Sequence, residues 1–161
     1  MRMRDRQLAP DEYEAMLDEN FVGTLSLSDG DSPYAVQLEY VYHQGAIYMA
    51  TYMEGRKVDC LNRNNRAVFT VFEDRHTHRD MIKRKVRCRS LMAEGYVETI
   101  HIKEVTNHKG AVIPFRILKF TIEKRGSWQC NRKRCSLTAG NDNKKIVRGW
   151  VEEARQANKG E

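Results

Sequence analysis

The sequence predicts a mainly β protein whose antiparallel strands close into a barrel flanked by a few helices. One observation is a series of segments rich in alternating, β-branched or aromatic residues. These segments are 22–28, 33–42, 46–52, 66–73, 86–102 and 111–124. A second observation is that the first three are joined by short glycine-containing turns at 28–31 and 43–45. Strands joined in this way pair as hairpins, and such a meander favours closure into a barrel.

The length and composition predict one globular domain covering residues 1–161. A chain of 161 residues with 40% hydrophobic residues can bury a single core. No apolar run is long enough to span a bilayer, and the start of the chain lacks the apolar segment of a signal peptide. We therefore expect a cytoplasmic protein that does not associate with membranes. Four scattered cysteines and five histidines suggest neither a disulfide framework nor a metal site.

The net charge of +6 is unevenly distributed. Residues 1–80 contain 9 Lys and Arg against 14 Asp and Glu, whereas residues 81–161 contain 19 against 8. Such asymmetry is typical of nucleic-acid binding, but also of a dimer whose acidic and basic parts attract, or of a pocket for an anionic cofactor. The aromatic residues do not interleave with the cations as a stacking platform requires, so the sequence argues against nucleic acid.

A helix is predicted near each end of the chain. Pro10 followed by two acidic residues marks a helix start, and Tyr13, Met16 and Leu17 then share one face. We expect this helix to pack on one end of the barrel. A C-terminal helix is predicted over 141–158, where Asn141 or Asp142 can cap it. Its apolar stripe consists of Ile146, Val147, Trp150, Val151 and Ala154.

The segment 46–73 contains the candidate chemistry. It reads as a strand, a tight basic turn, a short helix and a second strand covered on both faces. Gly55 supplies backbone freedom, and Arg56 and Lys57 follow where the helix begins. Unpaired N–H groups and the helix dipole favour an anion at this point, and two adjacent cations strengthen that preference. The turn therefore suits a phosphate, although two solvated surface cations would look the same in sequence.

The same segment resembles a known family. Ile47-Tyr48-x-x-Thr51, then Gly55-Arg56-Lys57, then Leu61-x-x-Asn64, is similar to the pyridoxamine-phosphate-oxidase-related flavoproteins, in particular the branch with the nitroimidazole-resistance proteins. The stretch 88–95 is similar to the family strand that reaches the FMN phosphate. The resemblance extends over roughly Arg4 to Val97. It implies a split β-barrel with Greek-key-like connections, and a homodimer that binds FMN at the subunit interface.

The resemblance also implies roles for individual residues. Arg56 and Lys57 would neutralise the FMN phosphate, and Ser90 would add a hydroxyl hydrogen bond. Thr51, Gln37 and Glu39 would lie near the flavin ring. Ala50 stands where nitroimidazole-resistance relatives have a histidine, so nitro-drug reduction is not expected. The residues that hold the phosphate of a vitamin B6 substrate are not recognisable near the C-terminus, so oxidation of that vitamin is not expected either.

The sequence leaves two kinds of function open. The first is an FMN-dependent oxidoreductase that transfers hydride or electrons to a small-molecule acceptor, because the cofactor itself supplies this chemistry. The second is a protein that holds a flavin or haem without turnover. His43, His101 and His108 are the candidate haem ligands for that alternative.

Overall fold

The computed structural model describes residues 7–74, 88–129 and 148–153. The chain divides into two compact units, of which the first comprises Met1–Glu73 and Arg89–Gln129. In the second unit, residues 148–153 are helical, and Trp150 and Val151 are exposed there. This helix lies within the predicted range 141–158, whose remaining residues are outside the described parts. Two of the four cysteines, Cys130 and Cys135, also lie outside them.

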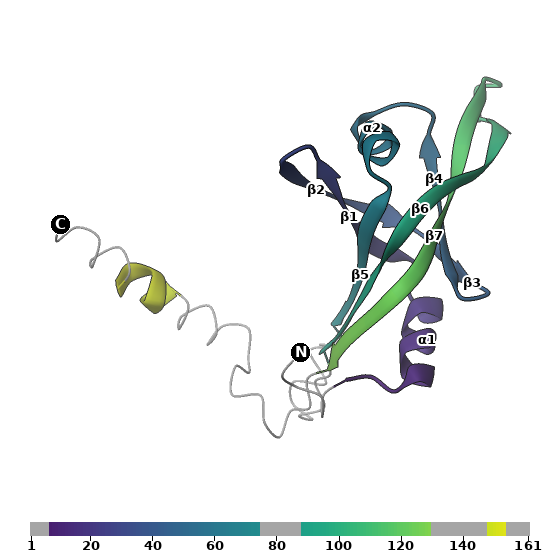
Figure 1. The fold of residues 1–161 in the computed structure, drawn as a ribbon. Helices are drawn as coiled ribbons and strands as arrows, with labels where there is room; N and C mark the ends of the chain where they lie inside the picture. The colour runs from purple at the N-terminus through teal and green to yellow at the C-terminus, as the bar shows by residue number, and fades with distance from the viewer. Residues whose placement is uncertain (1–6, 75–87, 130–147, 154–161) are drawn as a thin grey trace. The chain divides into compact units, whose positions relative to one another are not determined.

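The first unit is an antiparallel seven-stranded sheet with two helices (Figure 1). Its elements are α1 (Pro10–Glu19), β1 (Val22–Asp29), β2 (Ser32–Glu39), β3 (Val41–His43), β4 (Ala46–Tyr52), α2 (Arg56–Arg63), β5 (Arg66–Asp74), β6 (Cys88–Thr106) and β7 (Val112–Gln129). The strand order is β2-β1-β5-β6-β7-β4-β3. Because the outermost strands β2 and β3 are consecutive in the chain, the sheet curls into the predicted split barrel.

The core lies on the inner face of this sheet. Every second residue of a strand points inward, and the largest buried side chains, Phe69 and Phe120, come from β5 and β7. The ring of Phe69 lies 5.1 Å from that of Tyr40 and 6.1 Å from that of Phe120. These contacts join both halves of the sheet into one hydrophobic cluster.

Helix α1 covers one end of the barrel, as predicted. Tyr13, Met16 and Leu17 are buried, and the Tyr13 hydroxyl donates to the Met92 carbonyl at 3.0 Å. Burial raises the pKa of Tyr13 to about 12. Figure 1 shows α1 and α2 at opposite ends of the sheet. The β4–α2 turn is therefore remote from α1.

The prediction of a single strand over 33–42 is wrong in one respect, because this segment forms two strands. Residues up to Glu39 pair with β1, whereas Val41–His43 pair with β4. Between them Tyr40 donates its backbone N–H to Phe21 at 2.8 Å and its hydroxyl to the Leu17 carbonyl at 3.0 Å. These two bonds and the buried ring fix a corner that carries the chain from one edge of the sheet to the other.

Two further expectations differ from the structure. The outer face of β5, predicted to be covered, is not covered within the described chain, since Phe72 is 64% exposed. The last strand extends beyond the predicted range 111–124 to Gln129, where it pairs with β6. The β6–β7 register shifts between Glu94 and Gly95. Finally, none of the described helices is long and apolar enough to cross a membrane.

Candidate functional site

The basic turn has the conformation that its sequence predicts. Gly55 has a φ of +122°, which a residue with a side chain adopts only with strain. α2 begins at the next residue, Arg56, and its buried residues Val58 and Cys60 anchor it to the barrel. Glycine and the helix start thus leave the first backbone N–H groups of α2 without helical partners.

Lys57 is the partly buried cation of this turn. Burial lowers the pKa of its ammonium group below the usual value of 10.5. An anion that binds beside this lysine stabilises the charged ammonium group, which burial otherwise disfavours. Thr51, four residues before Gly55, is buried at the end of β4.

The structure adds Arg116 to this turn. Arg116 pairs with Thr51 across the β4–β7 ladder, and its Nε donates to the Met53 carbonyl at 3.1 Å. This bond fixes a third cation beside the chain segment that leads into α2. No local sequence pattern predicts this contact, because Arg116 and Met53 are 63 positions apart and only the pairing of β4 with β7 brings them together.

Arg56 bonds to the β1–β2 hairpin, and its side chain is 58% exposed. Its Nε donates to Asp29 at 2.8 Å, and its guanidinium lies 4.6 Å from the centre of the Tyr34 ring. Arg63, at the other end of α2, donates to the second Asp29 oxygen at 2.7 Å. Hydrogen bonds from these two arginines lower the pKa of Asp29. The hairpin therefore sets the orientation of Arg56, and no local sequence pattern marks this contact.

A groove runs over the outer face of β3 and β4, and it contains the candidate residue Glu39. We call it the β4 groove. It has a volume of about 480 Å³ and is lined by Phe21, Glu39, Tyr40, Val41, Tyr48, Met49, Ala50 and Ile117. Its lining is mainly apolar, which suits a flat aromatic ligand.

The outer face of β4 connects this groove with the basic turn. Ala50 and Tyr52 are both exposed on it, and the Tyr52 ring stacks on Phe115 with 5.1 Å between centroids. Arg56 lies six positions after Ala50, which limits the distance between their Cα atoms to about 20 Å. An elongated ligand with an aromatic ring and an anionic end can contact both places.

The remaining candidates lie elsewhere in one chain. Gln37 is exposed on β2 and lines a separate hollow of about 350 Å³ with Thr24, Thr70 and other residues. Ser90 pairs with Trp128, whereas Thr51 pairs with Arg116 twelve residues earlier on β7. At about 3.3 Å per residue of strand, these twelve residues of β7 correspond to roughly 40 Å. The structure thus brings Thr51, Arg56 and Lys57 together but does not bring Ser90 to them within one chain.

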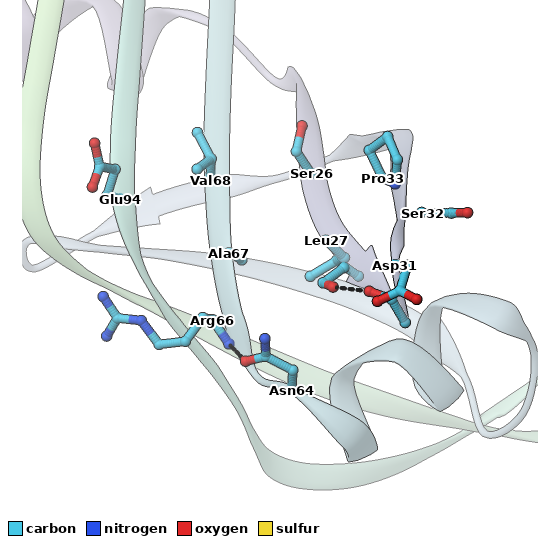
Figure 2. A pocket seen from close by; sticks show the side chains of 12 residues that line it. Ser26, Leu27, Asp31, Ser32, Pro33, Asn64, Arg66, Ala67, Val68 and Glu94 are labelled. Carbon is cyan, nitrogen blue, oxygen red and sulfur yellow. Dashed lines mark hydrogen bonds between the residues drawn. The ribbon is translucent and has the colours of Figure 1, made fainter.

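A hollow of about 570 Å³ between the β1–β2 hairpin and the start of β5 contains none of the candidates (Figure 2). Its cation Arg66 is paired with Glu123 at 2.7 Å, and its Glu94 lies 3.9 Å from Lys124. Figure 2 shows local hydrogen bonds beside it, for example from the Arg66 backbone N–H to Asn64. We do not assign a ligand to it. The described residues also contain no group of three or more His, Cys, Asp or Glu that could hold a metal ion.

The sequence was also compared with models of protein families. Residues 9–119 match the model described as pyridoxamine 5'-phosphate oxidase. This chain belongs to the pyridoxamine 5'-phosphate oxidase family. The matched range includes both the basic turn and the β4 groove, and it confirms the resemblance seen in the sequence. No curated protein matches the chain significantly.

Solved structures share the fold of this family member at low sequence identity. An FAD-binding protein from Mesorhizobium loti is 21% identical with a TM-score of 0.59, over 78% of this chain and 98% of that one. An FAD- and haem-binding protein from Mycobacterium smegmatis is 14% identical with a TM-score of 0.58, over 76% and 72%. A putative 5-nitroimidazole antibiotic resistance protein from Bacteroides thetaiotaomicron is 16% identical with a TM-score of 0.57, over 76% and 86%.

Proposed function

We propose that this member of the pyridoxamine 5'-phosphate oxidase family is a flavoprotein that binds FMN. The observation that carries the proposal is the start of α2, where Gly55 at φ +122° precedes Arg56 and the partly buried Lys57. Free backbone N–H groups, the helix dipole and two cations meet there, which is the chemistry of a phosphate site. Solved proteins of the same fold that bind FAD support a flavin as the ligand.

The residues present fit the phosphate end of such a ligand. Lys57 would supply a point charge, and Arg56 has further guanidinium N–H groups besides the Nε that Asp29 engages. Gly55 has no atom within 4 Å of the position of a Cβ, so the backbone is open to a ligand at this point. Arg116 would add long-range attraction and hold the turn in place through Met53.

The β4 groove would take the flavin ring. Tyr48, Ala50 and Ile117 offer an apolar surface, and Glu39 offers a carboxylate at its rim. When bound, the flavin supplies hydride or electron transfer, and we propose a small-molecule acceptor. The small Ala50 side chain leaves space over the groove for that molecule.

We also propose that the protein is a cytoplasmic homodimer with the flavin at the subunit interface. Exposed apolar residues on the outer face, such as Phe21, Val41 and Phe72, support a second copy as the cover of this surface. In a dimer, Ser90 and Gln37 of the partner subunit would be able to complete a site that one chain leaves open.

Comparison of FMN with riboflavin tests the proposal. The two ligands differ only in the phosphate, so a phosphate site predicts that FMN binds at least about tenfold more tightly. Affinities would be measured by the quenching of flavin fluorescence with the full chain at equilibrium. Equal affinity for both ligands, or binding of neither, would contradict the proposed site.

The pKa of Lys57 predicts a pH dependence for FMN affinity. Because burial lowers this pKa, the free protein loses the Lys57 proton at a lower pH than an exposed lysine does. FMN affinity should therefore fall as the pH rises from 7 to about 10, and binding should take up a proton in that range. In the Lys57→Arg variant the charge persists, so its affinity should fall less. Parallel pH profiles for the two proteins would argue against contact between Lys57 and the phosphate.

Reduction by a nicotinamide cofactor distinguishes an oxidoreductase from a protein that only stores or senses flavin. The FMN-loaded protein would be mixed with NADH or NADPH without oxygen, and loss of flavin absorbance would be followed. Bleaching faster than that of free FMN under the same conditions is the result expected for the enzyme. A flavin that stays oxidised with both donors would favour the binding function.

A further inference from the structure

The carboxylate of Asp29 links the β1–β2 hairpin to both ends of α2. Its Oδ2 accepts a hydrogen bond from Arg56 Nε at 2.8 Å, and its Oδ1 accepts one from Arg63 Nη2 at 2.7 Å. Arg56 and Arg63 are the first and last residues of α2. Residues seven apart in a helix differ in direction by only about 20°, so both side chains leave the same face of α2 and can reach one carboxylate. The hairpin lies beside the helix (Figure 1).

The hairpin fixes the position of Asp29 itself. Asp29 is the last residue of β1 and pairs with Ser32 at the end of the β1–β2 ladder. The turn that follows contains Gly30 at a φ of +64°, and the Ser28 hydroxyl donates to the Gly30 carbonyl at 2.8 Å. A carboxylate on a turn held in this way is a fixed point to which a long, flexible arginine side chain can bind.

The bond to Asp29 decides which N–H groups of Arg56 remain for a ligand. Within the described residues it is the one hydrogen bond of the Arg56 side chain, and it uses Nε. Both terminal amino groups of the guanidinium therefore remain as donors, and such groups bind phosphate oxygens. The Tyr34 ring, 4.6 Å from the guanidinium carbon, restricts the side chain further. A side chain that is restricted before the ligand arrives loses less entropy on binding.

The charge of Asp29 has the opposite effect on an anionic ligand. A carboxylate beside a phosphate site repels the phosphate. Arg63 offsets this repulsion, because two arginines and one aspartate together have a charge of +1, whereas Arg56 and Asp29 alone would have none. The positional effect and the charge effect of Asp29 thus differ in sign, and an experiment can separate them.

We propose that Asp29 is a positioning residue of the phosphate site. It holds Arg56 through Nε so that the terminal amino groups bind the phosphate, and Arg63 neutralises its charge. The inference rests on the proposed binding of FMN at the start of α2.

Replacement of the carboxylate by an amide tests the positional effect. Asp29→Asn keeps the size of the side chain but loses the charge-assisted bond to Arg56, so FMN affinity should fall on the order of fivefold. The loss should not exceed that in Arg56→Ala, because Asp29 acts through Arg56. Riboflavin affinity should stay the same, since riboflavin has no phosphate. If charge alone mattered, FMN would instead bind more tightly to Asp29→Asn. Quenching of flavin fluorescence with the full chain measures both ligands.

Asp31→Asn is the matched control. Asp31 lies in the same hairpin, is exposed, and has no ion pair with a described residue. The substitution makes the same change in charge without loss of a bond to Arg56. FMN affinity should therefore be unchanged or slightly higher. Thermal midpoints of both variants should stay near that of the wild type, because exposed ion pairs contribute little to stability.

Arg63→Gln tests the neutralising effect separately. The bond between Asp29 and Arg56 is kept in this variant, but the Asp29 charge is less well compensated. FMN affinity should fall about twofold at low ionic strength and recover relative to the wild type at high salt, because salt screens exposed charges. The loss in Asp29→Asn should persist at high salt. No effect of Arg63→Gln at low salt overturns the role given to Arg63.

A double-mutant cycle shows whether Asp29 acts through Arg56. In the Arg56→Ala background, Asp29→Asn should no longer weaken FMN binding, because only the repulsion by Asp29 is then removed. Equal weakening in both backgrounds overturns the inference. Unchanged or tighter FMN binding by the Asp29→Asn single variant also overturns it, and leaves the FMN site standing as long as the wild type prefers FMN to riboflavin. A wild type without that preference overturns both.

Discussion

Removal of both cations at the start of α2 should lower FMN affinity at least about a hundredfold. Each hydrogen bond to a charged group contributes about 1.5–3 kcal/mol, and a factor of ten corresponds to about 1.4 kcal/mol. Arg56→Ala/Lys57→Ala removes one or more such bonds at each position. Riboflavin affinity should change little, because riboflavin has no phosphate to lose contact with. Fluorescence titration with both ligands measures the two effects.

The control for this experiment is Arg66→Ala/Lys124→Ala. It lowers the net charge by the same amount, and both side chains are exposed members of surface ion pairs. General attraction of an anion to a basic protein would weaken FMN binding equally in both double variants. A local phosphate site predicts a large loss only in Arg56→Ala/Lys57→Ala. Equal losses for FMN and riboflavin would instead point to a damaged turn.

Gly95→Ala should destabilise the fold by about 3 kcal/mol, in the upper range for insertion of a methyl group into a packed structure. A Cβ at Gly95 would lie 1.8 Å from the carbonyl oxygen of Thr121 and 3.0 Å from its carbonyl carbon. These are backbone atoms of β7, so relief requires a shift of the strand rather than a change of rotamer. Thermal unfolding should show a decrease in the midpoint of about 10 °C for a chain of this size.

Gly126→Ala is the matched control on the facing strand. A Cβ at Gly126 meets only Met92, with its nearest atom at 3.5 Å, which is ordinary van der Waals contact. The same chemical change in the same strand pair should therefore be close to neutral, or slightly stabilising through the unfolded chain. Similar destabilisation by both substitutions would show that loss of glycine itself, rather than the contact with Thr121, is responsible.

The local elements were predictable where short-range signals agree. The strand at 46–52, the turn at Gly55 and the helix from Arg56 were all found at the predicted places. Each depends on propensity, glycine conformation and the spacing of apolar residues within a few positions. The corner at Tyr40 was missed because 33–42 has the same alternation as one straight strand. Only the hydrogen bonds of Tyr40 to Leu17 and Phe21 divide it.

The candidate site was predictable only in part, for a related reason. Arg56 and Lys57 can be identified from the sequence by their position after Gly55, since a helix start is a local feature. Asp29 and Arg116, which contact this turn, come from distant strands, and no local pattern marks them. The distance between Ser90 and Thr51 likewise follows from the β6–β7 and β4–β7 registers, which depend on tertiary pairing.

The sequence by itself determined the barrel class, the family resemblance and the basic turn at Arg56 and Lys57. Tertiary structure alone decided that Asp29 orients Arg56 and that Arg116 supports the turn. It also decided that, within the described residues, β7 alone pairs with β6 after Val97. The physical reason is that helix starts and strand alternation are set by neighbours in the chain. Cross-strand contacts depend on register, which only the packing of the whole core fixes.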